Sequence, residues 1–65
     1  MAFQVDAVHC NRESDSGKAL QMTCEEHGTF WVPKSVIDDD SEVYDVGHTG
    51  ALVVSDWFAE EKGWA

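Results

Sequence analysis

Four side chains have the residue types of a zinc site: His9, Cys10, Cys24 and His27. Two thiolates and two imidazoles are a common structural zinc set, and such ligands usually come in pairs from short knuckles. Only Cys24 and His27 have a knuckle-like spacing of two intervening residues. His9 and Cys10 are adjacent, and neighbours along a strand point to opposite faces of a sheet. The spacing therefore disfavours a metal site.

Neither a calcium loop nor a catalytic group is complete in the sequence. Asp38, Asp40 and Glu42 resemble the start of a calcium loop, but Val43 and Thr49 stand where that loop needs glycine and glutamate. An enzyme needs a nucleophile beside a base, or two carboxylates held at different pKa values. The sequence offers no such motif and no phosphate-binding glycine pattern. We therefore predict a protein that is not an enzyme and has no metal and no cofactor.

The remaining chemical signal is the excess of acids. Thirteen Asp and Glu stand against four Lys and Arg, which gives a formal net charge of −9 over 65 residues. DNA is itself a dense anion, so direct binding to nucleic acid or to an acidic membrane surface is not expected. A basic partner is the natural complement, because clustered charge steers association. The alternative is that the charge only keeps a small protein soluble.

We predict that acidic side chains bind this partner; they form a first patch and a second candidate patch, and which of the two faces the partner stays open. Acids two residues apart on a strand stand roughly 6.6 Å apart, a spacing that can imitate a row of phosphates. Within the patches, Asp56 and Glu60 have the i,i+4 spacing of one helix face. The first patch falls within 21 residues and the second on a C-terminal helix: Glu25, Glu26, Asp38, Asp39, Asp40, Glu42 and Asp45, and then Asp56, Glu60 and Glu61.

The first half of the chain has the pattern of strands. Residues 3–7 alternate apolar and polar side chains, which predicts a strand with one buried face. The polar run 11–17 ends in glycine and predicts a flexible loop. Residues 18–24 and 29–32 flank a turn at 25–28, which predicts a hairpin.

The register of this hairpin stays open. A four-residue loop places Trp31 opposite Met22, whereas a bulge would place Phe30 and Val32 on that side. Because both faces of residues 29–32 carry apolar side chains, we expect a central strand covered on both sides. Trp31, Phe30 and Phe58 are the aromatic residues expected in the core.

The segment after Pro33 predicts a link and a second hairpin. Lys34 begins an extended or single-turn link and is expected to pair with Asp38. Residues 43–46 and 51–54 flank a glycine-containing turn, which favours two further strands joined to each other.

The end of the chain predicts a short helix over residues 57–62. Ser55 is the expected N-cap, and Gly63 supplies the C′ position, so that Trp64 can fold back on the helix. Two helical turns do not persist alone in water, so the helix must dock on the sheet. Either Trp57 or Trp64 is a candidate exposed anchor for a partner.

Together these patterns predict an α+β fold: an antiparallel sheet of about four strands with one C-terminal helix packed on it, in one compact domain over residues 1–65. The longest apolar run, residues 51–54, has only four residues, so neither a membrane span nor a signal peptide is expected. We therefore expect Cys10 and Cys24 to be reduced in a cytoplasm, as small buried side chains.

Motifs over residues 18–64 resemble a family of very short proteins carried by phages and other mobile elements of bacteria. In that family an apolar strand leads into a W-(I/V)-P-K-S turn, and a glycine-preceded strand leads into a W-x-A-x-x-K-G helix. The matching segments here are residues 31–38, 41–43, 50–54 and 57–63.

Within this group the chain is most similar to type I-C anti-CRISPR proteins of Pseudomonas. The resemblance implies a protein of the host bacterial cytoplasm that disables Cascade, the RNA-guided surveillance complex. By analogy with other RNA-guided effectors, Cascade holds DNA in basic channels. We expect a monomer whose acidic patches imitate DNA and block target-DNA binding. Blockade of nuclease-helicase recruitment, or regulation of another basic partner, stays open as an alternative.

Overall fold

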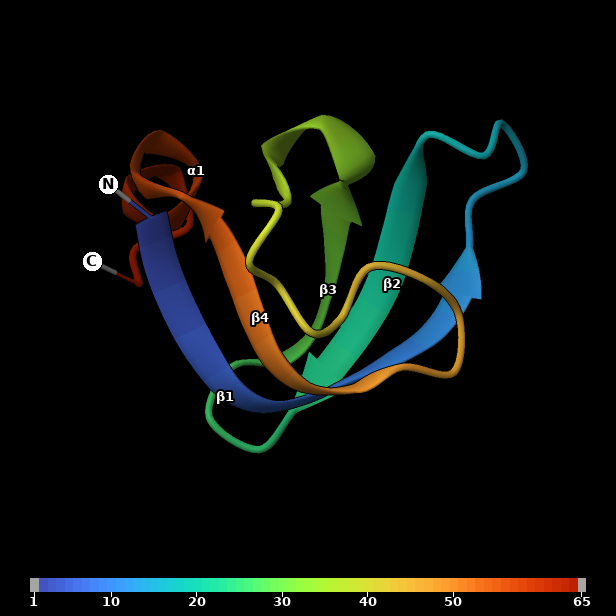
Figure 1. Cartoon of the computed structure of the whole chain (residues 1–65), viewed down its shortest axis with the longest axis horizontal. Helices are drawn as coiled ribbons and strands as arrows, with labels where there is room; N and C mark the ends of the chain where they lie inside the picture. Colours follow the sequence, from blue (N-terminus) through green and yellow to red (C-terminus); the bar gives the residue numbers. More distant parts are fainter. Residues whose placement is uncertain (1, 65) are drawn as a thin grey trace.

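The computed structural model describes residues 2–64, and over this range the chain forms a four-stranded antiparallel sheet with one C-terminal helix packed on it (Figure 1). The strand order is β3-β2-β1-β4. The predicted α+β fold is confirmed. The elements are β1 (Ala2–Glu13), β2 (Ala19–Cys24), β3 (Gly28–Pro33), the 3-10 turn η1 (Lys34–Val36), β4 (Thr49–Ser55) and α1 (Asp56–Glu61).

Strand β1 is the long central strand, pairing with β4 along its first part and with β2 along its second. Its register shifts between Val5 and Val8, where Ala7 has a φ of 55°, and it shifts again between Cys10 and Arg12. Such bulges bend a strand and increase its twist. Figure 1 shows β1 curving, so the sheet wraps around its inner face.

The length of β1 corrects the predicted loop at 11–17. Residues 11–13 continue the strand, and the connection to β2 covers residues 14–18. Pairing with β2 supplies partners for the backbone of this polar segment, which its composition alone does not reveal. His9 is exposed and Cys10 is buried, as expected for neighbours on a strand.

The hairpin of β2 and β3 is confirmed, and Phe30 and Val32 lie on the side given by the second alternative, although a three-residue turn over 25–27 and not a bulge places them there. Phe30 pairs with Met22, and Trp31 pairs with Gln21. Phe30 and Val32 therefore face the core, and the expectation of a buried Trp31 is wrong, since 41% of it is exposed. The expectation of a central strand is also wrong, because β3 is at the edge of the sheet.

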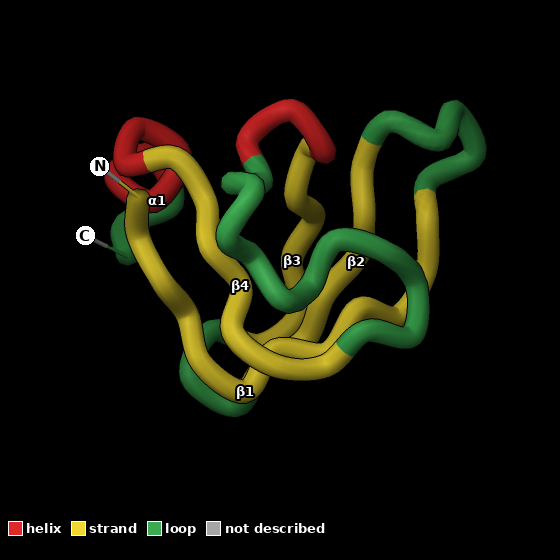
Figure 2. The backbone as a smooth tube through the Cα atoms, in the orientation of Figure 1, coloured by secondary structure: helices red, strands yellow, loops and turns green. Residues whose placement is uncertain are grey.

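The second predicted hairpin is not formed. Residues 43–46 are irregular, and β4 pairs with β1 instead (Figure 2). The segment between η1 and β4, called the crossing segment, crosses the inner face of the sheet (Figure 1) and buries Val43 there, next to the buried Val36 of η1. The apolar residues within 43–46 therefore do not mark a strand. Val43 covers the core from the inner side, while β4 takes its backbone partners from β1.

Helix α1 is two turns or less and docks through Phe58 and Ala59, both buried. The predicted ending is confirmed: Gly63 has a φ of 79°, and the Trp64 amide donates to the Ala59 carbonyl at 2.8 Å. Ser55 is the N-cap by position, but its hydroxyl donates to the Val36 carbonyl at 3.4 Å instead of capping the helix.

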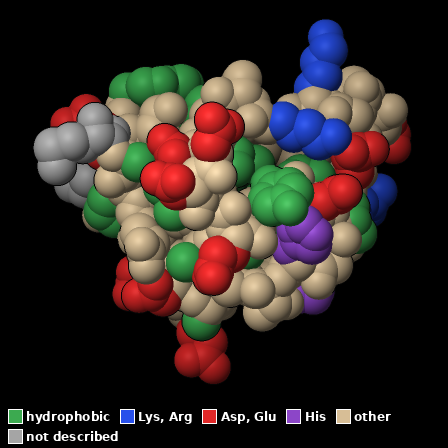
Figure 3. Space-filling view, in the orientation of Figure 1, with side chains coloured by type: hydrophobic (Ala, Val, Ile, Leu, Met, Phe, Trp, Pro, Cys, Tyr) green, Lys and Arg blue, Asp and Glu red, His purple; other side chains and the backbone are tan. Residues whose placement is uncertain are grey.

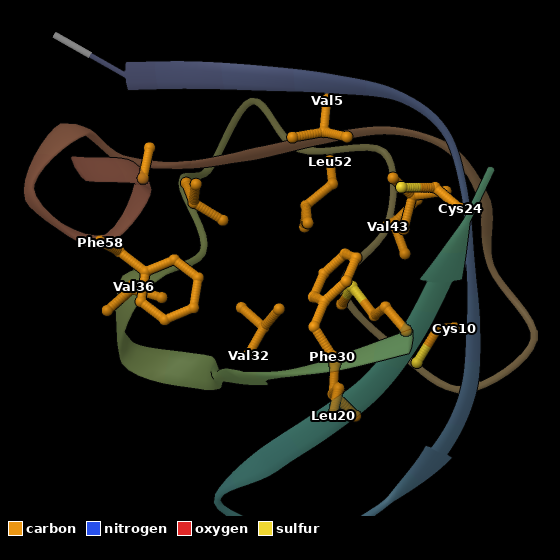
Figure 4. Close-up of a cluster of buried hydrophobic side chains, with 14 residues drawn as sticks. Val5, Cys10, Leu20, Cys24, Phe30, Val32, Val36, Val43, Leu52 and Phe58 are labelled. Atoms are coloured by element: carbon orange, nitrogen blue, oxygen red, sulfur yellow. The ribbon is translucent and has the colours of Figure 1, made fainter. Parts of the chain in front are cut away.

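The core lies between the inner face of the curved sheet, the crossing segment and α1. Figure 4 shows side chains from all of these elements directed into one interior. The largest fully buried side chains are Leu20, Met22, Leu52, Val8, Val32, Val43, Val54 and Cys10. No helix within residues 2–64 is long and apolar enough to cross a membrane.

Part of the outer face of the sheet carries a row of polar side chains. His9 Nδ1 lies 2.6 Å from Thr49 Oγ1, and Asn11 Nδ2 donates to Thr23 Oγ1 at 2.6 Å. Thr23 Oγ1 is also 3.1 Å from Thr29 Oγ1. Polar side chains thus bond across three strand pairs on this part of the face.

Candidate acidic binding surface

All ten acids predicted to bind a partner are exposed. They come from three places in the fold. Glu25 and Glu26 lie in the β2–β3 turn, residues 38–45 lie on the crossing segment, and the remaining three lie on α1. Figure 3 shows acidic side chains gathered on the face covered by the crossing segment, with basic side chains at one edge of it. We call residues 37–48 the acidic loop.

Three of the predicted acids meet around one depression of about 460 Å³. Its wall contains Asp38, Asp39 and Asp45, and Lys34 stands among them. The other lining residues are Glu13, Ile37 and Tyr44. The acidic loop and the end of β1 therefore make one concave, predominantly acidic surface.

Glu13 is a member of this surface that sequence reasoning missed. Its carboxylate forms an ion pair with the Lys34 ammonium, which replaces the predicted pairing of Lys34 with Asp38. The two residues are 21 positions apart, and the extension of β1 to Glu13 brings them together. Only the polar composition of residues 11–17 marked this segment, and that composition predicted a loop.

The start of the acidic loop is held by its own backbone. The Asp38 amide donates to the Val53 carbonyl at 2.8 Å, next to the isolated bridge between Ile37 and Val54. One carboxylate oxygen of Asp38 accepts the Asp40 amide at 3.0 Å. This turn holds the Asp38 carboxylate in place.

Ser41 is the polar anchor of the loop. It is only 5% exposed, and its hydroxyl oxygen accepts the Val53 amide at 3.1 Å and the Val43 amide at 3.2 Å. The same hydroxyl lies 3.0 Å from the Val43 carbonyl, to which it donates. One buried side chain thus replaces the regular hydrogen bonds that an irregular segment lacks.

Glu42 has a structural partner of its own. Its Oε1 accepts the Ala51 amide at 2.9 Å, and its amide donates to the Ala51 carbonyl at 2.9 Å. Gly50 makes room for this contact, because a Cβ there would lie 2.7 Å from Oε1 of Glu42. The prediction of a partner-binding Glu42 remains, but one of its carboxylate oxygens is already bonded to the edge of β4.

The end of the loop is tied to β1. The Cys10 amide donates to the His48 carbonyl at 2.9 Å, and the Gly47 amide donates to the Cys10 carbonyl at 3.0 Å. Asp45 Oδ1 accepts the Val46 amide at 2.8 Å, and the Tyr44 and His48 rings meet edge to face at 4.5 Å. The acids of the loop are therefore presented by a segment fixed at both ends.

The acids of the β2–β3 turn are separate from the depression. Lys34 follows β3, whereas Glu25 and Glu26 precede it, so they lie at opposite ends of this strand. Glu26 Oε1 is 3.0 Å from Nε2 of His27, whose ring stacks on Trp64 at 4.6 Å. The acids of the predicted first patch therefore lie at two separate places on the surface, residues 38–45 on the acidic loop and Glu25 and Glu26 in the β2–β3 turn.

The helical patch consists of Asp56, Glu60 and Glu61 on the exposed side of α1. Asp56 lies in the first turn, where negative charge is favourable near the positive end of the helix. The ammonium of Lys62 lies 5.6 Å from the centre of the Phe58 ring.

Cys10 and Cys24 are free, buried thiols. Burial raises the pKa of Cys10 above its ordinary value of 9.0, and the negative charge of Asp45 raises it further. A raised pKa keeps the thiol protonated and unreactive near neutral pH. Within residues 2–64, no group of three His, Cys, Asp or Glu side chains is arranged to hold a metal ion.

Comparison of the chain with protein-family models, with curated proteins and with solved structures gives no match. The function is therefore argued from the geometry and charge of the surface.

Proposed function

We propose that this protein is a non-enzymatic anti-CRISPR inhibitor that acts in the host bacterial cytoplasm. It binds a basic DNA-binding surface of the type I-C Cascade complex and blocks target-DNA binding by imitating the charge of DNA. The family resemblance of residues 18–64 suggests the partner, and the acidic surface suggests the mechanism.

The observation that carries the mechanism is the placement of Asp38, Asp39 and Asp45 around one depression, on a loop whose backbone is pinned to β4 and β1. A loop that is fixed at both ends loses little backbone freedom on binding, so preorganisation favours association. The net charge of −9 adds long-range attraction to a basic channel and repulsion of DNA.

The test is a gel shift of labelled target DNA with purified type I-C Cascade, with the protein added either before or after the DNA. Prior addition should abolish the shifted band. An unchanged band would contradict DNA exclusion, and a pull-down of Cascade would then separate a block of nuclease-helicase recruitment from an unrelated partner.

A matched pair of variants locates the surface. Asp38→Lys/Asp39→Lys and Asp6→Lys/Asp15→Lys change the net charge equally, but only the first pair lines the depression. The first variant should lose inhibition and the second should keep it. Equal loss in both would mean that overall charge, and not the acidic loop, is responsible.

A further inference from the structure

A second depression, of about 450 Å³, lies between the β2–β3 hairpin and α1. We call it the tryptophan groove, because Trp31 and Trp57 both line it. The other lining residues are Ala19, Pro33, Phe58, Glu61 and Lys62. None of the acids of the acidic loop takes part in it, so it is a different site from the acidic depression, although Glu61 of the helical patch is one of its lining residues.

The two tryptophans are exposed although the core is small. Trp31 is 41% exposed and Trp57 is 56% exposed. The hairpin register turns Trp31 outward opposite Gln21, and α1 turns Trp57 outward while Phe58 enters the core. Two large indoles bordering one depression form the kind of apolar surface that marks binding sites, and tryptophan is enriched at interface hot spots.

Charge selects the occupant of this groove. A second copy of the chain also carries −9, so self-association through the groove opposes strong repulsion. A nucleic-acid base could stack on indoles, but its phosphates are repelled by the same charge. A cationic side chain is not repelled, because the net negative charge of the protein attracts it.

The chemistry of the lining favours a guanidinium. Indole faces attract cations, and the planar guanidinium of arginine stacks on aromatic rings as well. Glu61 supplies a carboxylate in the lining, and such a group pairs with guanidinium N–H donors. The cation within the groove, Lys62, lies over the Phe58 ring.

We propose that the tryptophan groove binds an arginine side chain presented by a basic protein partner. The identity of that partner as Cascade rests on the proposed function, whereas recognition of arginine does not. The groove then supplies a short-range, shape-dependent contact, which complements the long-range attraction of the acidic loop.

The first test is a titration of the full chain with Nα-acetyl-arginine amide, followed by NMR of the three indole N–H signals. The Trp31 and Trp57 signals should shift saturably, and the neutral Nα-acetyl-citrulline amide should leave them unchanged. Equal shifts with citrulline amide, or no shift of either tryptophan, would overturn the proposal.

A pair of variants connects the groove to the partner. Trp57→Leu keeps an apolar side chain but removes the aromatic face, and Trp57→Phe keeps an aromatic face. Trp57→Leu should weaken both arginine-amide binding and Cascade inhibition about tenfold, with a smaller loss for Trp57→Phe. Inhibition equal to wild type in both variants would overturn the role in partner binding.

The two proposals fail in different ways. If the unaltered protein does not bind Cascade, the proposed function fails, and the arginine-amide titration alone decides the groove. If Cascade is inhibited but arginine amide does not shift Trp31 or Trp57, the groove proposal fails and the acidic loop stands.

Discussion

The acidic loop and helix α1 both present carboxylates to solvent, but different forces hold them on the sheet. The loop has no regular structure, and its backbone is fixed by the Ser41 hydroxyl and by amide bonds to β4 and β1. The helix docks through Phe58 and Ala59, and its end is closed by the hydrogen bond from the Trp64 amide to the Ala59 carbonyl. The comparison shows that charge can be positioned either by a polar network or by apolar packing, and the two respond differently to mutation.

The largest effect is expected where apolar packing is removed. Phe58→Ala should destabilise the fold by about 3–5 kcal/mol, since it deletes a buried aromatic side chain. A domain of this size has a total stability of roughly 3–10 kcal/mol, so much of this variant should be unfolded. Urea unfolding followed by circular dichroism measures it. Trp57→Leu, on the exposed side of the same helix, is the control and should change stability by less than about 0.5 kcal/mol.

The next effect concerns binding and distinguishes the two acidic surfaces. Asp38→Lys/Asp39→Lys should weaken binding to Cascade by about 2 kcal/mol, or about 30-fold, because each exposed ion pair contributes up to about 1 kcal/mol. Asp56→Lys/Glu60→Lys tests the helical patch with the same change of charge and leaves Glu61, which lines the tryptophan groove, unaltered. Affinity measured at several salt concentrations should show the flattest salt dependence for the variant whose patch faces the partner. Identical behaviour of the two variants would remove the distinction between loop and helix.

A smaller effect is expected when the polar network of the loop is cut. Ser41→Ala leaves the Val43 and Val53 amides without their buried acceptor, which should cost about 1–2 kcal/mol. Ser55→Ala is the matched control, because that hydroxyl makes one long bond of 3.4 Å and should cost less than about 0.5 kcal/mol. Thermal unfolding of both variants checks this. Equal stabilities would show that Ser41 does not anchor the loop.

The smallest expected effect is a dependence of stability on pH that comes from the Cys10 thiol, whose pKa Asp45 of the acidic loop helps to raise. Because the folded thiol has a raised pKa, its contribution to stability is complete below the ordinary value of 9.0 and is lost as pH rises through the folded pKa. Unfolding measured from neutral to alkaline pH should therefore show a decline that Cys10→Ala reduces. Asp45→Asn should lower the thiol pKa, since it removes the second-largest cause of the shift. A pH dependence unaltered in Cys10→Ala would exclude this thiol as the cause.

Local patterns in the sequence were sufficient for several elements. The hairpin of β2 and β3, the turn at Lys34 and the glycine ending of α1 depend on residues within one or two turns of each other. The exposure of the ten acids is equally predictable, because unpaired carboxylates are costly to bury. Their positions in the fold, around the depression, in the β2–β3 turn or on α1, could not be predicted from local sequence patterns.

The chain by itself determined the α+β class, the acidic surface and the local capping of its helix, because charge, alternation and glycine conformation are properties of short segments. Tertiary structure decided that β4 pairs with β1, that β1 reaches Glu13, and that Trp31 faces solvent. Each of these depends on which strand, distant in the sequence, supplies the backbone hydrogen bonds, and on which face of a strand is buried by the rest of the chain. The acidic loop illustrates the reason: Ser41 can replace a missing backbone ladder only where β4 lies beside it.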